Sequence, residues 1–144
     1  MNQVVILYPV FVQVFLTIAV LLSLAPARGR SLRVTRQRLS DTDVELGRNV
    51  WSDQATKRAN NFRNQFEIPI LFYAVVAFAL ITKGADTLML VLAWLFVLTR
   101  VVHAAVHLGP NKIRFRAPIY VLGVAVVLIM WIKLALHVAS AGLA

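Results

Sequence analysis

The chain contains no cysteine among its 144 residues. This absence excludes disulfide bonds, zinc sites built on thiolates and a cysteine nucleophile. Any thiol chemistry at this protein therefore needs a thiol from another molecule. Acidic residues are also scarce, because six Asp and Glu stand against 15 Lys and Arg, which gives a formal net charge of +9. Nucleic-acid binding is not expected, since the basic residues flank hydrophobic segments and no groove-reading element accompanies them.

Only one long polar stretch is present, because 60% of the residues are apolar and the mean hydropathy is +0.76. This composition is typical of an integral membrane protein. Four apolar segments come near the roughly twenty residues that a membrane-spanning helix needs. They cover residues 4–25, 60–82, 87–108 and 117–139. We therefore expect an all-α fold, an integral membrane four-helix bundle, with residues 1–144 forming a single transmembrane domain.

Basic residues gather in two of the three connections between these segments. With four spans, the first connection (26–57) and the third lie on one side, and the positive-inside tendency places that side in the cytoplasm. Both termini are then expected outside. An N-terminal signal peptide is not expected, because the first apolar stretch is too long and no positive charge precedes it. The expected location is a bacterial inner membrane or a membrane like that of the endoplasmic reticulum. The arginines could set this topology, touch anionic lipid headgroups or serve a site: Arg28, Arg30, Arg33, Arg36, Arg38, Arg48, Arg114 and Arg116.

The second segment is too short to cross a bilayer with its apolar residues alone. Its apolar run begins after Glu67 and is well short of the roughly 30 Å hydrocarbon core. We therefore expect Asn60, Arg63 and Asn64 to enter the membrane with Glu67 on one helix face. Pro69 follows and removes a backbone donor, so a kink or wet pocket is expected one turn earlier. A structural polar seam and a functional site explain the cluster equally well.

The third segment carries a matching polar face formed by Arg100, His103 and His107. The two histidines have the spacing of a metal pair, but a third ligand would have to be Glu67 or a residue of another subunit, so no metal site is predicted. The fourth segment opens with further polar residues. All four segments thus bring polar side chains to one leaflet, where a cationic pocket would attract an anionic, amphiphilic or peptide-like ligand: Arg28, residues 60–67, residues 100–107, Arg116 and Tyr120.

These polar motifs carry a family resemblance. Residues 57–69 contain Arg-Asn-x-x-Glu from Arg63 to Glu67, and Arg-x-x-His at 100–103 and Arg-x-x-x-Tyr at 116–120 follow. The pattern resembles that of the MAPEG proteins, the membrane-associated proteins in eicosanoid and glutathione metabolism, and it extends over all four spans. The resemblance implies a four-helix subunit that assembles as a homotrimer and binds glutathione between subunits on the cytoplasmic side.

The resemblance also implies roles for individual residues. Arg116 resembles the arginine beside the glutathione sulfur, where a fixed cation lowers the pKa of the thiol and so favours the nucleophilic thiolate. Arg100 resembles an arginine with a structural role, and Asn60 is taken as structural too. The expected glutathione contacts are Arg28, Arg63, Asn64, Glu67, His103, His107 and Tyr120.

Three positions depart from the nearest pattern within the family. Asn60 replaces a common arginine, His107 replaces a glutathione-contacting tyrosine, and Ala117 replaces a serine. Prostaglandin synthesis is therefore not inferred, and the resemblance implies a glutathione-dependent transferase or peroxidase acting on hydrophobic electrophiles or lipid hydroperoxides. Two other classes stay open: a noncatalytic binder of lipids or amphiphiles with the same fold, and a small multidrug transporter in which Glu67 carries protons. The arginines around Glu67 argue against the transporter, because they would repel a cationic cargo.

Overall fold

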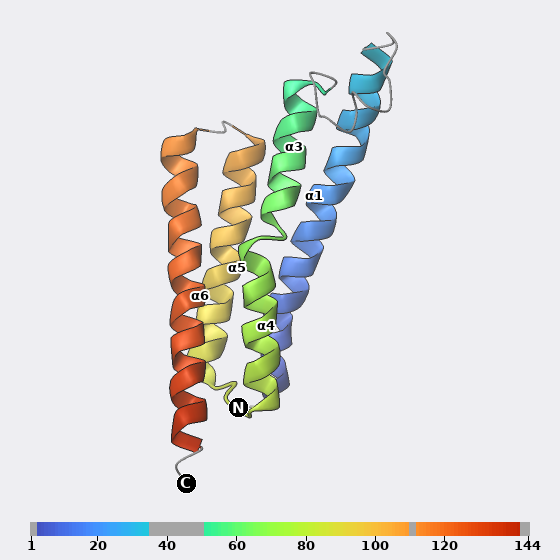
Figure 1. The fold of residues 1–144 in the computed structure, drawn as a ribbon. Coiled ribbons are helices and arrows are strands. Elements are labelled where there is room, and N and C mark those ends of the chain that lie inside the picture. The colour runs from blue at the N-terminus through green and yellow to red at the C-terminus, as the bar shows by residue number, and fades with distance from the viewer. Residues whose placement is uncertain (1–2, 35–50, 110–111, 142–144) are drawn as a thin grey trace.

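Helices make up most of the described structure, and the described residues contain no strand. The computed structural model describes residues 3–34, 51–109 and 112–141, and these fold into a helical bundle (Figure 1). Four helical segments are long and apolar enough to cross a membrane, if α3 and α4 are counted together. The predicted all-α membrane bundle of four helices is thereby confirmed. The elements are η1 (Gln3–Ile6), α1 (Leu7–Val34), α3 (Asp53–Asn64), α4 (Ile68–Ile81), α5 (Thr87–Leu108) and α6 (Ile113–Ala141).

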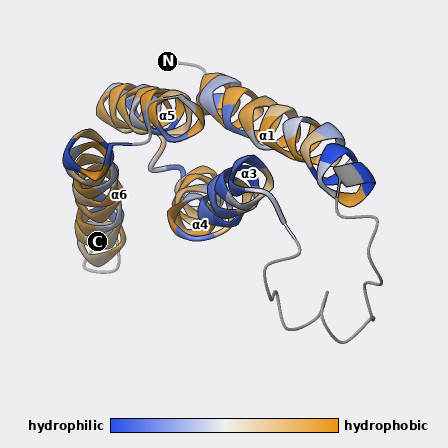
Figure 2. Ribbon diagram, turned by 90° about the horizontal axis from the view of Figure 1, so that it is seen from above, coloured by the Kyte–Doolittle hydropathy of each residue, from blue (hydrophilic) through white to orange (hydrophobic). Residues whose placement is uncertain are grey.

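The helices run antiparallel, so the bundle has two distinct ends. Seen from above, α5 lies between α6 and α1, and α3 and α4 follow one another along one side of this row (Figure 2). We call the end where α1 and α5 finish and α3 and α6 begin the basic end. The other end, which carries η1, the turn between α4 and α5, and the last turns of α6, is the terminal end (Figure 1).

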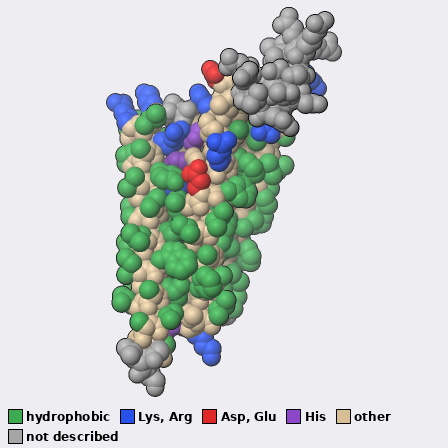
Figure 3. All heavy atoms as spheres, viewed as in Figure 1, with side chains coloured by type: hydrophobic (Ala, Val, Ile, Leu, Met, Phe, Trp, Pro, Cys, Tyr) green, Lys and Arg blue, Asp and Glu red, His purple; other side chains and the backbone are tan. Residues whose placement is uncertain are grey.

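The core of the bundle lies between α4, α5 and α6. Phe72 and Phe96 stack there with ring centroids 4.5 Å apart, and Met89 and Met130 are fully buried beside them. Most of the remaining surface is apolar, as the space-filling view shows (Figure 3). Lipid tails are as apolar as these side chains, so close packing rather than the exclusion of water holds the helices together.

The first helix is longer than the sequence indicated. We expected it to end near Ala25, but α1 continues through Pro26 to Val34. Pro26 leaves one backbone carbonyl without its helical donor. Packing offsets this loss, because Ala27 and Ser31 continue the buried stripe of the helix, and the Ser31 hydroxyl accepts from the Ser52 N–H at 2.8 Å. The predicted loop 26–57 is thus helical at both ends, and Arg36, Arg38 and Arg48 lie outside the described residues.

The second span is two helices instead of the single predicted helix 60–82. It begins at Asp53, where the Ser52 hydroxyl accepts from the Ala55 N–H as an N-cap, and it breaks between Asn64 and Ile68. Pro69 explains the break, because proline fits the first turn of a helix and has no N–H to donate to the Gln65 carbonyl one turn back. The break lies one turn before Pro69, where the sequence predicted a kink.

The remaining spans lie close to their predicted positions. The helix α5 has the predicted bounds 87–108. The helix α6 starts earlier than the predicted residue 117, because the Lys112 carbonyl already accepts the N–H groups of Phe115 and Arg116. Pro118 therefore lies inside α6 instead of at its start.

The turn between α4 and α5 is a compact capping structure at the terminal end. Lys83 adopts a φ of 58°, and the Gly84 N–H bonds the Ala79 carbonyl at 2.8 Å, which is the Schellman pattern of helix termination. The Asp86 carboxylate then caps α5 by accepting from the Met89 N–H at 2.9 Å, and it pairs with Lys133 at 2.6 Å. Although burial acts to raise the pKa of Asp86, the hydrogen bonds from Lys133 and the Met89 backbone lower it overall.

Candidate functional site

A cluster of polar side chains lies near the basic end, on α5, on α6 and at the break before α4. Charged and histidine side chains gather on this part of the surface, whereas the middle of the bundle is covered by apolar groups (Figure 3). On α5, Arg100, His103 and His107 share the buried face, as their spacing predicted. The helix α6 supplies Arg116 and Tyr120 opposite them.

His107 and Arg116 form the link between α5 and α6 nearest the basic end. The Nη1 of Arg116 lies 3.1 Å from Nε2 of His107. His107 is only 2% exposed, and its Nδ1 has no hydrogen-bond partner among the described residues. His107 therefore faces Arg116, the residue for which the resemblance implies a position beside the glutathione sulfur.

Tyr120 connects this cluster to the second span. Its hydroxyl donates to the Glu67 carboxylate at 3.2 Å, which ties α6 to the break between α3 and α4. The His103 ring lies 5.7 Å from the ring of Tyr120 and 5.9 Å from that of His107, measured between centroids. Three residues of separate motifs, Glu67, His103 and Tyr120, thus form one continuous polar surface.

Arg100 lies beneath this surface and packs directly on the backbone of α6. Its Nη2 lies 3.3 Å from the Tyr120 carbonyl and 3.5 Å from the Ile119 carbonyl, and the guanidinium stands over the Tyr120 ring at 5.1 Å. Gly123 makes this approach possible, because a Cβ there would overlap Nη2 of Arg100 and lie 2.8 Å from the Thr99 hydroxyl oxygen. Arg100 is 1% exposed, so the geometry suits the structural role that the sequence suggested.

A model of the MAPEG family matches residues 6–136. The chain belongs to the MAPEG family. No curated protein and no solved structure matches the chain. The family includes glutathione-dependent transferases and peroxidases, its members generally use glutathione as a substrate, and many are trimeric. The chain is accordingly an integral, multi-pass membrane protein.

Other predicted contacts of this MAPEG protein lie on the outside of the single chain. Arg63 is exposed on α3, and Asn64 is half-buried; Asn60, which was expected to be structural, is exposed as well. Arg28 is exposed on α1, where its guanidinium stands 5.1 Å from the centre of the Trp51 ring. Arg28 and Arg63 are thus exposed on the single chain, in contrast to the buried histidines of α5. Their roles toward glutathione stay predictions.

The inward polar residues of α3 are ones that the sequence reasoning missed. Asn61 and Gln65 are buried, and Gln13 of α1 donates to the Gln65 side-chain oxygen at 2.9 Å. Gln65 donates in turn to Asn61 at 3.5 Å, and Asn61 donates to the Ala104 carbonyl of α5 at 3.4 Å. Gln13 was the available signal, because a lone amide in an otherwise apolar span usually faces other helices.

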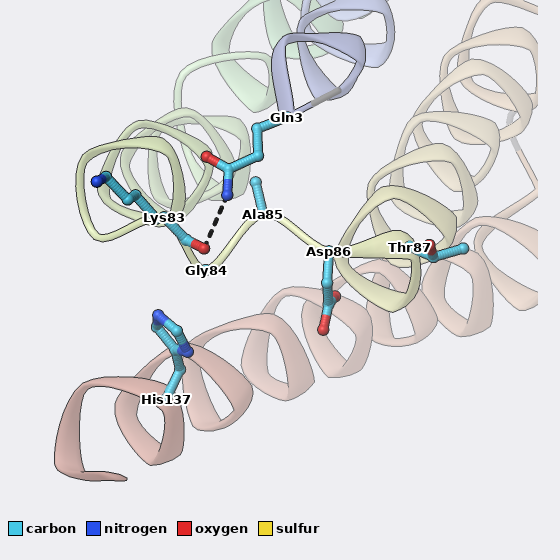
Figure 4. A pocket seen from close by; sticks show the side chains of 7 residues that line it. All are labelled: Gln3, Lys83, Gly84, Ala85, Asp86, Thr87 and His137. Atoms are coloured by element: carbon cyan, nitrogen blue, oxygen red, sulfur yellow. Dashed lines mark hydrogen bonds between the residues drawn. The ribbon is translucent and has the colours of Figure 1, made fainter. Parts of the chain in front are cut away.

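Two polar pockets lie at opposite ends of this MAPEG chain. One, of about 150 Å³ at the basic end, lies between α3 and the last residues of α5 and includes Lys57 and Arg58 in its wall. The other, of about 340 Å³ at the terminal end, is formed by the α4–α5 turn, Gln3 and His137 (Figure 4). Gln3 donates there to the Lys83 carbonyl at 2.9 Å. Among the described residues, no group of three or more His, Asp or Glu could hold a metal ion.

Proposed function

We propose that this MAPEG protein is a membrane-bound glutathione-dependent transferase or peroxidase acting on hydrophobic electrophiles or lipid hydroperoxides. The observation that carries the proposal is the position of Arg116. Arg116 is half-buried near the basic end, where its guanidinium lies against His107 and one helical turn from Tyr120. A cation fixed in that place stabilises a thiolate, and the thiolate is the reactive form of glutathione.

The charges around Arg116 suit the other groups of glutathione. Glutathione carries two carboxylates and one ammonium group, and the chain offers Arg63 and Arg28 for the former and the Glu67 carboxylate for the latter. Arg28 and Arg63 are exposed on the single chain, so a site that uses them is completed by a second copy. We therefore propose a homotrimer with glutathione bound between subunits, on the cytoplasmic side, and with both termini outside.

The chemistry requires little from the protein besides binding and charge. In transfer, the thiol proton leaves to water, the sulfur forms a bond to an electrophilic carbon, and the leaving group departs with the bonding electron pair. In peroxide reduction, two glutathione thiols are oxidised to a disulfide while the O–O bond of the hydroperoxide is reduced to an alcohol and water. A hydrophobic substrate dissolved in the bilayer would reach this site from the lipid side, so the membrane concentrates it beside the thiolate.

The finer resemblance of the motifs is to microsomal prostaglandin E synthase, which shares the Arg-Asn-x-x-Glu, Arg-x-x-His and Arg-x-x-x-Tyr spacing. Prostaglandin synthesis is not proposed for this chain. Ala117 lacks the hydroxyl of the serine in that pattern, and His107 is engaged with Arg116 instead of presenting a phenol.

Glutathione binding by the purified protein in detergent tests the proposal. Ultraviolet absorbance of the thiolate is measured for the native chain, for Arg116→Ala and for Arg114→Ala. Arg114 is the matched control, because it opens the same helix but is exposed, with its guanidinium over the Phe115 ring. We expect a thiolate signal from the native chain and the control that is lost in Arg116→Ala.

Two results would contradict different parts of the proposal. If the native protein binds no glutathione at cellular concentrations, the glutathione function fails and a lipid or amphiphile binder of the same fold takes its place. If glutathione binds but Arg116→Ala keeps the full thiolate signal, only the role of Arg116 fails. Turnover of hydrophobic electrophiles and of lipid hydroperoxides then separates a transferase from a peroxidase.

A further inference from the structure

The hydrogen bond between His107 and Arg116 fixes the chemical form of the histidine. A guanidinium has only donors and stays protonated in proteins, so Nη1 of Arg116 donates across the 3.1 Å separation. Nε2 of His107 must then be the acceptor. A neutral imidazole that accepts at Nε2 carries its proton on Nδ1. The geometry therefore assigns a neutral Nδ1–H tautomer to His107.

The charges around His107 agree with a neutral ring. The charged groups that act on it are Arg116 of α6 and Lys57 of α3, and both are cations. On α5 itself, the neighbour is the His103 ring, 5.9 Å away between centroids. A proton on Nε2 would place a second donor against Arg116 with no acceptor between them, and the doubly protonated ring would add a second positive charge. The hydrogen bond would then be lost.

We propose that His107 is a positioning residue that holds the Arg116 guanidinium where it stabilises the glutathione thiolate. This inference rests on the proposed function. The His107 acceptor directs the Arg116 guanidinium toward α5, whereas long basic side chains near helix ends otherwise tend to extend toward the membrane surface. The hydrogen bond to His107 ties the half-buried Arg116 side chain to α5. The role differs from a glutathione contact, which the resemblance implied for this position.

The chain contains an internal standard for the tautomer. At the terminal end, Nε2 of His137 lies 3.0 Å from the Thr82 carbonyl oxygen. A carbonyl can only accept, so His137 donates and carries its proton on Nε2. The two histidines are thus expected to be opposite tautomers in one molecule.

Nitrogen NMR of the imidazole rings tests the assignment in the full-length native chain in detergent, near neutral pH and without glutathione. His107→Gln and His137→Gln identify the two sets of signals by their disappearance. We expect the Nδ1–H pattern for His107 and the Nε2–H pattern for His137. An Nε2–H tautomer or a cationic ring at His107 overturns the inference, whatever the protein does with glutathione.

The thiolate assay tests the positioning role itself. His107→Phe keeps a flat ring but removes the acceptor, whereas the amide oxygen of His107→Gln can still accept from Arg116. We expect the pKa of bound glutathione to rise by about one unit in His107→Phe, a roughly tenfold fall in the ionisation constant of the thiol, and to stay near the native value in His107→Gln. The affinity for S-methylglutathione, which has no ionisable thiol, should remain native in both variants.

The possible outcomes separate this inference from the proposed function. If the native chain binds glutathione as thiolate and His107→Phe keeps the native thiolate fraction, the positioning role is refuted and the glutathione function stands. If the native chain binds no glutathione, the proposed function falls and the positioning role falls with it, while the NMR result still decides the His107–Arg116 hydrogen bond. If His107→Phe fails to fold, a native-like thiol pKa in His107→Gln supports the inference, and a raised pKa in that variant refutes it.

Discussion

Gly123→Ala should be one of the most damaging small substitutions in the chain. The new methyl group would overlap the Arg100 guanidinium and crowd the Thr99 hydroxyl at 2.8 Å. Arg100 would have to withdraw from α6 and lose its contacts with the Ile119 and Tyr120 carbonyls. Because Arg100 is 1% exposed, no water can replace them.

The magnitude follows from three contributions. Overpacking a tight contact costs about 1–3 kcal/mol. Weakening hydrogen bonds from a charged donor costs about 1.5–3 kcal/mol each when they are well formed, and less here because both are 3.3 Å or longer. Replacing a glycine inside a helix by alanine stabilises the helix by about 1 kcal/mol, which offsets part of this loss. We therefore expect a net destabilisation of about 2 kcal/mol.

Gly29→Ala is the matched control, because a Cβ at Gly29 in α1 would meet no atom within 4 Å. Thermal unfolding of the purified protein in detergent should show Gly29→Ala at or above the native midpoint and Gly123→Ala clearly below it. A second test removes the Arg100 guanidinium that the new methyl group would overlap. In an Arg100→Met background, Gly123→Ala should lower the unfolding midpoint much less than it does in the native chain. Equal midpoints for the two alanine variants, or an unchanged cost in the Arg100→Met background, would refute the reasoning.

Three further predictions concern other parts of the chain. The depressed pKa of Asp86 means that its ion pair with Lys133 stabilises the fold above pH about 3.9 and is lost as the pH falls further, so Lys133→Met should cost up to about 1 kcal/mol at neutral pH and nothing in acid. Gln13→Leu should cost about 1 kcal/mol, because it leaves the buried side-chain oxygen of Gln65 without its donor. Lys83→Gly should raise stability by about 1 kcal/mol, since glycine adopts a φ of 58° without strain.

Unfolding midpoints in detergent measure all three effects. An acid-independent cost of Lys133→Met would argue against the ion pair as its cause. A native midpoint for Gln13→Leu would show that the amide chain across α1, α3 and α5 adds nothing to stability. For Lys83→Gly, a lower midpoint would mean that contacts of the lysine side chain outweigh the backbone strain.

The four spans and the position of the kink in the second one could be predicted from the sequence, whereas the full break into two helices and the inward face of α3 could not. Apolar length alone identifies a membrane span, and Pro69 alone stops a helix from continuing unchanged. Polar residues, however, occupy several faces of α3. Asn60 and Asn64 were expected inside, but Asn61 and Gln65, the neighbouring positions, are the buried pair. A shift of one residue rotates a helix face by roughly 100°, and hydropathy does not choose between such faces.

Within the candidate site, local spacing predicted the shared face of Arg100, His103 and His107 but not their partners. The partner of His107 depends on how far α6 is displaced along α5, which is set by tertiary packing. The position of the Arg100 guanidinium depends on the absence of a side chain at Gly123. Nothing in the hydropathy pattern distinguishes this glycine. Such contacts between helices lie beyond what spacing along one helix can show.

The broken second span also bears on how the protein enters the membrane. The helix α3 has 12 residues and α4 has 14, so neither reaches the roughly 20 residues that an insertion site recognises as a span. The polar α3 would be a poor segment to release alone into lipid. Gln13 of α1 offers Gln65 a hydrogen bond at the break. We therefore expect α1 to be retained at the translocation channel during synthesis. The three helices α1, α3 and α4 would then insert into the bilayer together as one hairpin.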